Sequence, residues 1–238
     1  MNERIAETRD WNQENYRKNG MKAQRRYPNE ELVRFLSRHY LGLDPASRAK
    51  TDVLEVGSGL CGNLWMPARE GLRAHGLDIS EEAIRLGGQT LASWGVSAKL
   101  TQGSMLEMPY PAASFDAVYD ILASFSLTVA EMSVYLGHVA RVLKPGGRFF
   151  LFTLGAESDA FKNHAPAVKI DEWTLDAIRR KDSPYYGCFY PHRFDRPENL
   201  AALIREAGLT PSVPETMDRS YNGGKERLQT ISVEAVRS

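Results

Sequence analysis

The chain has 238 residues, of which 42% are hydrophobic and 25% are charged, a composition typical of one globular domain with an apolar core. Lysine plus arginine and aspartate plus glutamate each total 30, so the formal net charge is zero. A neutral chain lacks the broad basic surface of most nucleic-acid and anionic-membrane binders. The two cysteines, Cys61 and Cys188, are far apart in the sequence, which argues against a disulfide framework or a zinc site.

The N-terminal segment is polar and charged, and no apolar run is long enough to cross a membrane. Together with the few cysteines, these features predict a cytoplasmic protein that holds no metal. Residues 1–27 also contain Trp11, Tyr16 and Tyr27, so we expect this segment to pack against the rest of the chain. A helix should follow, with Asn29 as its N-cap and an apolar stripe along one face.

Five short apolar segments predict strands at residues 52–56, 72–78, 98–102, 115–119 and 148–154. Helical patterns separate several of them. Ser80 caps one predicted helix, and a longer one carries apolar residues from Met132 to Leu143. Alternating strands and helices indicate a parallel sheet built from right-handed βαβ units.

The alternation stops at about Gly155. Residues 155–193 are rich in aromatic and charged side chains without a regular period, which suggests an inserted cap. A helix is predicted near Asp195 and Pro197, ending at Gly208. Two extended segments follow, at 211–219 and 227–236, joined by a hairpin turn. The predicted fold is therefore a doubly wound, Rossmann-like α/β domain with a mostly parallel seven-stranded sheet and a C-terminal antiparallel hairpin.

A glycine-rich loop follows the first predicted strand. Gly57, Gly59 and Gly62 match the pattern GxGxxG between a strand and a helix, where small residues let the backbone approach a ligand. The pattern alone does not identify the ligand, because loops of this kind bind NAD, FAD or S-adenosylmethionine. Asp78 ends the second strand, where a carboxylate can accept hydrogen bonds from a ribose diol.

Glu55 discriminates between these ligands because it lies two residues before the first glycine. A pyrophosphate at this position would face an unpaired carboxylate at low dielectric. S-adenosylmethionine has no phosphate and carries an ammonium and a sulfonium. The acid therefore favours the methyl donor over a dinucleotide.

Four segments together resemble the successive motifs of class I S-adenosylmethionine-dependent methyltransferases, in particular the broad small-molecule group that includes the ubiquinone-biosynthesis type. These segments are VLEVGSGLCGN (53–63), GLDIS (76–80), QGSMLEMPYPAASFDAVYD (102–120) and RVLKPGGRFFL (141–151). The resemblance covers about residues 50–155, the late helix and the terminal hairpin. KPGG within the last motif is interpreted as a structural turn.

The resemblance assigns roles to individual residues. Gly57, Ser58 and Gly59 would line the methionine and ribose portions of the donor, and Glu55 would lie near the amino group. Asp78 would hold the ribose diol. The other residues implied for donor binding are Ile79 against adenine, Ser104 and the Met105 backbone at the adenine amino group, Asp120 at the methionine end, and Tyr16 above the donor.

Two positions depart from the family pattern. Ser104 stands where the family usually has aspartate, and Cys61 stands where it often has a third glycine. We expect one methyltransferase domain over residues 1–238. Its parts would be an N-terminal helical lid at 1–45, a donor-binding core at 50–154, a cap insertion at 155–193, and a last helix and hairpin at 194–238.

Methyl transfer from a sulfonium is an in-line displacement, for which alignment of the acceptor suffices unless the acceptor must lose a proton. No fixed catalytic residue follows from the motifs. His164, His192 and Tyr186 are the candidates, together with the basic cluster at 179–181 for an anionic substrate, although a packing or surface role is the simpler explanation for each. The expected function is methyl transfer to a small molecule. The alternatives are an NAD(P)-dependent oxidoreductase and a non-catalytic protein that binds S-adenosylmethionine.

Overall fold

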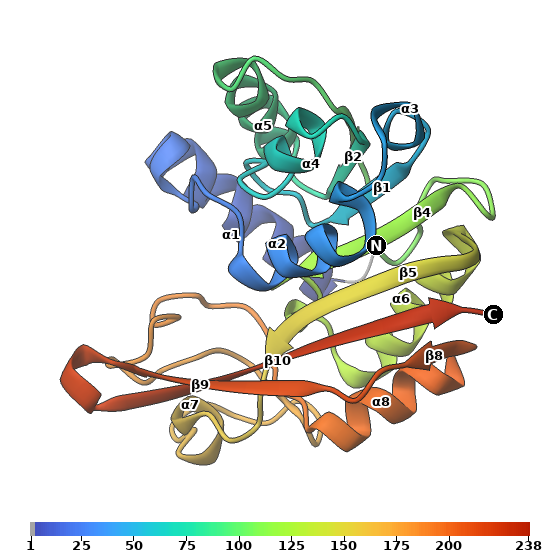
Figure 1. Ribbon diagram of the computed structural model, residues 1–238. Helices are drawn as coiled ribbons and strands as arrows, with labels where there is room; N and C mark the ends of the chain where they lie inside the picture. Colours follow the sequence, from blue (N-terminus) through green and yellow to red (C-terminus); the bar gives the residue numbers. More distant parts are fainter. Residues whose placement is uncertain (1–2) are drawn as a thin grey trace.

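The computed structural model describes residues 3–238, and an eight-stranded, mostly parallel sheet forms its centre (Figure 1). Seven strands follow the order β3-β2-β1-β4-β5-β10-β8, and β9 pairs only with β10. The first five strands run parallel. Their bounds are β1 Asp52–Val56, β2 Arg73–Asp78, β3 Lys99–Gln102, β4 Phe115–Ile121 and β5 Leu143–Leu154.

Alternate strand residues face opposite sides of the sheet, and helices cover both sides, which makes the fold doubly wound. Leu54, Val118 and Phe149 share one apolar core with α6 and α8. Val53 and Phe150 share the other with α2, α4 and α5. The helices are α2 Glu30–Leu36, α3 Pro45–Arg48, α4 Trp65–Arg69, α5 Glu81–Ser93, α6 Val129–Val142 and α8 Pro197–Glu206.

Side chains cap four of these helices, and the caps at α2 and α5 are those predicted from the sequence; the other two are Asp44 at α3 and Thr128 at α6. The Asn29 side chain accepts hydrogen bonds from the backbone at the start of α2, and Ser80 accepts one from Ala83 at the start of α5. Thr128 and Glu131 form a capping box on α6. The helix predicted near Asp195 and Pro197 is α8, which begins at Pro197 with Arg196 as its N-cap. The buried Asp195 carboxylate instead pairs with Arg193 at 3.0 Å.

The C-terminal hairpin differs from the prediction in one respect. Its first extended segment is divided at 212–214 into β8 (Leu209–Pro211) and β9 (Glu215–Tyr221), which pair with opposite ends of β10 (Glu226–Arg237). This division gives eight strands in place of the predicted seven. The β9–β10 ribbon extends beyond the parallel strands, with the short helix η4 (Asn222–Gly224) at its tip (Figure 1).

Two segments outside the sheet complete the fold. The N-terminal segment forms α1 (Glu3–Asn19) and the short helix η1 (Gly20–Lys22), and a π turn, η2 (Ser37–Leu41), follows α2. Between β5 and α8 the chain is mostly irregular and contains only α7 (Asp159–Lys162) and the two-residue strands β6 (Thr174–Leu175) and β7 (His192–Arg193). Every helix in residues 3–238 is too short or too polar to cross a membrane.

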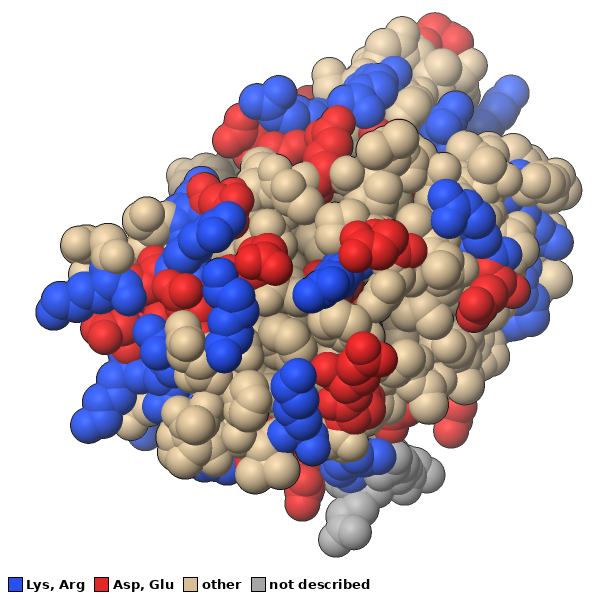
Figure 2. Space-filling model, turned by 90° about the horizontal axis from the view of Figure 1, so that it is seen from below, with Lys and Arg blue, Asp and Glu red and all other residues tan. Residues whose placement is uncertain are grey.

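Charged side chains of both signs lie beside one another over the face of the molecule at the cap and ribbon end (Figure 2). On the cap and the β9–β10 ribbon, Lys162 pairs with Glu157 and Arg227 pairs with Asp218. This mixture of positive and negative side chains agrees with the formal net charge of zero.

Candidate active site

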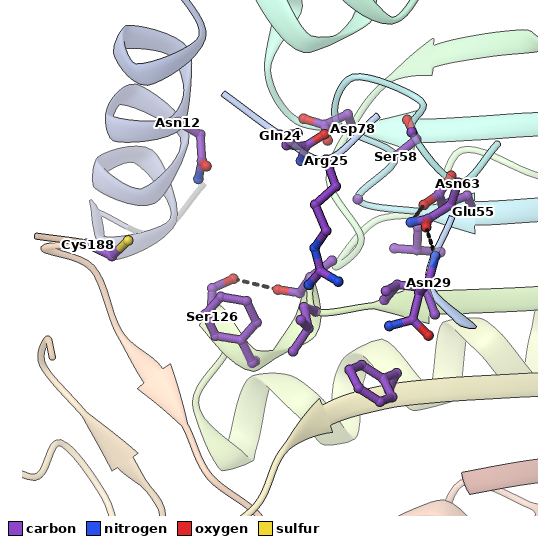
Figure 3. A pocket seen from close by; sticks show the side chains of 18 of the residues that line it. Asn12, Gln24, Arg25, Asn29, Glu55, Ser58, Asn63, Asp78, Ser126 and Cys188 are labelled. Carbon is purple, nitrogen blue, oxygen red and sulfur yellow. Dashed lines mark hydrogen bonds between the residues drawn. The ribbon is translucent and has the colours of Figure 1, made fainter. Parts of the chain in front are cut away.

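A cavity of about 1330 Å³ lies at the carboxyl ends of β1, β2 and β4 (Figure 3). This edge is where open parallel sheets bind their ligands. The sheet contributes Glu55, Asp78 and the β4 end, while α1, the segment before α2, the cap and the β9–β10 ribbon form the remaining walls. The cavity therefore has one half built on the sequence motifs and another half built from segments distant in the chain.

The glycine loop has the backbone conformation that its sequence requires. Gly57 and Gly59 have φ values of 67° and 48°, in the left-handed region. A side chain on Gly57 would collide with Ala123 from the end of β4. Cys61, at the position of the family's third glycine, keeps the left-handed conformation with φ 60°. The cysteine therefore adopts a backbone conformation that glycine reaches without strain.

Asp78 joins the loop to the end of β2. Its carboxylate accepts hydrogen bonds from the backbone N–H groups of Gly59 and Ser80, at 2.8 and 2.9 Å. The side chain is buried at the cavity wall, and burial raises its pKa. Each oxygen has a second lone pair, so the carboxylate can accept two further hydrogen bonds from a ligand.

Glu55 is a buried acid with one unpartnered oxygen. Asn63 donates a hydrogen bond to its Oε1 at 2.7 Å, whereas Oε2 has no partner among the described residues. Burial raises the pKa of this carboxyl well above its ordinary value, and the nearby Asp78 and Asp120 carboxylates raise it further. A buried, unpaired acid favours a cationic ligand beside it.

Residues 23–29, which we call the strap, cover the glycine loop. Gln24 accepts a hydrogen bond from the Leu60 backbone at 2.7 Å and donates one to the Tyr16 hydroxyl at 3.1 Å. The Asn29 backbone donates to the Asn63 side chain at 2.9 Å. No role was predicted for either side chain, because Gln24 lies outside the motifs and Asn63 stands at the end of the first motif, after its glycines.

Most residues predicted for donor binding line the cavity. These are Glu55, Gly57, Ser58, Asp78, Ile79, Ser104, Met105 and Tyr16. Ser104 also accepts a hydrogen bond from the Leu106 backbone at 3.1 Å. Gly59 does not line the cavity because the Gln24 side chain covers it.

The structure corrects the predicted position of Asp120. This residue is buried and does not line the cavity. Its carboxylate turns back to accept hydrogen bonds from the Ala123 and Ser124 backbone, at 2.9 and 3.1 Å, at the start of η3 (Ser124–Ser126). Asp120 therefore shapes the loop that closes on Gly57 and does not face the methionine end of a ligand.

The three candidate catalytic residues also lie elsewhere. His192 is fully buried behind the cavity wall, where burial lowers its pKa to about 4, and it contacts the Tyr190 carbonyl through Nδ1 at 2.7 Å. His164 contacts the Ala167 carbonyl at 3.0 Å, and Tyr186 is exposed on the cap. None of the three lines the cavity.

An aromatic wall bounds the half of the cavity away from the glycine loop. It consists of Trp11, Phe125, Tyr185 and Tyr190. Trp11 meets Tyr190 edge-on at a centroid distance of 5.0 Å, and Phe125 lies 5.8 Å from Tyr185. Burial raises the pKa of both tyrosines, so their phenols are neutral hydrogen-bonding groups. This surface suits a planar or apolar molecule.

Comparison with known proteins assigns the family. A family model described as a methyltransferase domain matches residues 53–147. The chain is 31% identical over 204 residues to the ubiquinone/menaquinone biosynthesis C-methyltransferase UbiE of Rhizobium etli, covering 79% of this chain and 74% of that protein. The chain belongs to the class I S-adenosylmethionine-dependent methyltransferases. This family uses S-adenosylmethionine as methyl donor and releases S-adenosylhomocysteine.

Other relatives of this methyltransferase match a smaller part of their own length or are more distant in sequence. It is 38% identical over 132 residues to a sterol 24-C-methyltransferase of Gibberella zeae, covering 52% of this chain but only 33% of that enzyme. A methyltransferase structure from Methanosarcina mazei shares its fold with a TM-score of 0.65 at 20% identity, covering 78% of this chain and 92% of that one. A structure of a putative methyltransferase from Bacillus halodurans has a TM-score of 0.66 at 15% identity, covering 88% of this chain and 99% of that one.

Proposed function

We propose that this methyltransferase transfers a methyl group from S-adenosylmethionine to a small-molecule acceptor bound against the aromatic wall. The observation that carries the proposal is the unpartnered Oε2 of buried Glu55, beside the glycine loop and the Asp78 carboxylate. Such a group suits the ammonium of S-adenosylmethionine and opposes a diphosphate. The donor's sulfonium, when bound, supplies a methyl group activated for displacement.

The protein would hold the donor through residues of both the motifs and the strap. Asp78 would accept hydrogen bonds from the two ribose hydroxyls. Glu55 would accept one from the amino group, directly or through water. Ile79, Ser104 and the Met105 backbone would surround adenine, and Tyr16 with Gln24 would cover the donor from the N-terminal side.

Alignment would supply most of the catalysis. The acceptor would approach the methyl group from the aromatic wall, with Trp11 and Tyr190 positioning it in line. No histidine lines the cavity formed by the described residues. A proton lost by the acceptor would therefore pass to water, or the acceptor would bind already ionised. We also propose that α1 and the strap act as a lid, and that the protein is cytoplasmic, as its two free cysteines favour.

The test combines binding with turnover. We expect calorimetry to detect one S-adenosylhomocysteine per chain and no binding of NADH or NADPH. We expect label from methyl-tritiated S-adenosylmethionine to appear in the small-molecule fraction when a panel of aromatic acceptors is supplied. Dinucleotide binding would contradict the proposal in favour of an oxidoreductase. Donor binding without transfer to any acceptor would favour a non-catalytic binding protein.

A further inference from the structure

The acceptor half of the cavity contains a cation without an acidic partner. Arg25 extends from the strap across the middle of the cavity (Figure 3). Its side chain makes no hydrogen bond or ion pair with any residue from 3 to 238. A guanidinium at a ligand site offers five fixed N–H donors suited to a carboxylate or another anion.

The acids around the cavity are already engaged. Glu30 and Glu31 pair with Arg34, at 2.7 and 3.6 Å, and Asp218 pairs with Arg227 at 2.8 Å. Glu55 and Asp78 lie at the glycine loop, in the half that we assign to the donor. Arg25 therefore contributes an uncompensated positive charge to the cavity.

Arg25 belongs electrostatically to the aromatic wall and not to the donor half. Its charge acts on the Tyr185 phenol, opposing the effect of burial on the pKa of that residue. It has no comparable effect on the pKa of Glu55 or Asp78. On the donor side, Gln24 of the strap accepts a hydrogen bond from the glycine loop. Arg25, the next residue, extends toward the aromatic wall on the opposite side.

The basic cluster of the cap does not compete for this role. Arg179 pairs with Asp176 at 2.7 Å, and Arg180 pairs with the buried Glu226 at 2.8 Å. Neither residue lines the cavity. The two arginines of the cluster at 179–181 are therefore neutralised locally, and Lys181 does not line the cavity.

We infer that the acceptor is an anionic aromatic compound, whose ring packs on the aromatic wall and whose negative group is bound by Arg25. This inference rests on the proposed function and specifies its substrate class. It also accounts for a site without a histidine base: an acceptor held as an anion beside a guanidinium needs no base to remove a proton before methyl transfer. With the anionic atom as the methyl acceptor, its lone pair would form the new bond to the methyl carbon, the electrons of the broken C–S bond would remain on sulfur, and no proton would have to leave.

The experiment compares two probes of the same shape and different charge. We would titrate 2-naphthoate and 2-naphthamide into the full chain saturated with S-adenosylhomocysteine and measure the binding heat by calorimetry. We expect naphthoate to bind at least about tenfold more tightly than naphthamide, the factor that corresponds to 1.4 kcal/mol. Arg25→Gln should remove this preference, and Arg25→Lys should retain part of it.

Arg26→Gln is the matched control. Arg26 is the next residue, carries the same charge, and stacks over the Trp94 ring outside the cavity lining, 5.1 Å from its centroid. We expect this variant to keep the preference for naphthoate. Loss of the preference in Arg26→Gln as well would contradict a specific contact with Arg25.

Two further results would overturn the inference while leaving the proposed function intact. One is equal binding of the two probes, or binding of neither at millimolar concentration, by a protein that binds S-adenosylhomocysteine. The other is that Arg25→Gln weakens the binding of S-adenosylhomocysteine but not the binding of 5′-methylthioadenosine, which lacks the amino acid portion. Arg25 would then bind the carboxylate of the donor. Failure of the wild-type chain to bind S-adenosylhomocysteine would instead contradict the proposed function.

Discussion

Two buried carboxylates at the glycine loop have different local environments, and this difference separates their roles. Asp78 has a backbone partner for each oxygen, so it is held in place before a ligand arrives. Glu55 has only Asn63 on one oxygen, so it remains incompletely satisfied without a ligand. The first arrangement suits a fixed hydrogen-bond acceptor, and the second suits a partner for a cation.

At the residue scale, Asp78→Ala should weaken S-adenosylhomocysteine binding by about 2 kcal/mol or more, or about 30-fold, because two hydrogen bonds to a charged group are lost. Calorimetry of the purified variant would measure the change. Asp218→Ala is the control, since Asp218 lines the cavity in the acceptor half. An unchanged affinity in Asp78→Ala would show that the ribose binds elsewhere.

Glu55→Gln should increase the stability of the ligand-free protein while weakening donor binding. The folded state raises the pKa of Glu55, so the cost of burying its charge is absent below the ordinary carboxyl pKa and grows as the pH rises through the folded-state value. We expect a gain of about 1–3 kcal/mol at pH 8, in the range for an unsatisfied buried group, that diminishes toward pH 4. Denaturant unfolding at both pH values would measure it, and a gain independent of pH would contradict the assignment.

Sequence reasoning at this scale succeeded where a residue's role follows from its place in a motif. Glu55, Asp78 and Ile79 all line the cavity because the carboxyl ends of parallel strands meet at one edge of a sheet. It failed for Asp120, whose strand end was correctly located but whose side chain turns toward the η3 backbone. The position of a residue in a strand determines where its backbone lies, whereas the direction of its side chain depends on the loop that follows.

At the scale of elements, α5 packs directly on the glycine loop, and this contact explains a glycine that helix propensity disfavours. A Cβ on Gly87 would lie 2.7 Å from Cys61 Sγ and 3.1 Å from the Gly59 carbonyl oxygen. Gly88, its neighbour, has nothing within 4 Å of such an atom. Gly87 is therefore needed for close packing, while Gly88 is not.

These neighbouring glycines form a matched pair of substitutions. Gly88→Ala should stabilise the protein by about 0.5–1 kcal/mol, the usual difference between alanine and glycine within a helix. Gly87→Ala should destabilise it and weaken S-adenosylhomocysteine binding, because α5 would push the loop toward the donor. Thermal unfolding and calorimetry of both variants would measure these effects, and the same stabilisation in both would contradict the packing argument.

The elements of the core could be predicted because their apolar periods are clear. Four of the five predicted parallel strands and the helices after Ser80 and around Met132 occur at nearly the expected residues. The fifth strand, β5, begins at Leu143 and not at 148, because the KPGG segment interpreted as a turn is an irregularity within the strand and Leu143 already pairs with Phe115. The cap could not be predicted in the same way, since its two strands have only two residues each and its order comes from aromatic packing around Phe161 and Phe194. Contacts of this kind leave no periodic pattern.

At the scale of the whole molecule, the acceptor half of the cavity is assembled from segments far apart in the chain. Trp11 comes from α1, Phe125 from η3, Tyr190 from the cap, and Leu228 from β10. No local motif connects these residues, so the sequence predicts the donor half and leaves the acceptor half open. The substrate therefore has to be inferred from the chemistry of the assembled wall.

The strap connects both halves and should respond to the donor. Because S-adenosylhomocysteine would lie between the strap and the glycine loop, saturating ligand should slow tryptic cleavage after Arg25 and Arg26 about tenfold, by suppressing local opening. Cleavage after the exposed Lys225 at the ribbon tip is the internal control. Equal rates with and without ligand would contradict the proposal that the strap is part of a lid.

A crystal structure of the protein with S-adenosylhomocysteine would test the central claim most directly. We expect both ribose hydroxyls within hydrogen-bond distance of the Asp78 carboxylate, the amino group beside Glu55 Oε2, and the sulfur facing the aromatic wall. A dinucleotide bound at the glycine loop in preference to S-adenosylhomocysteine, or a ligand whose amino group lies away from Glu55, would contradict the account.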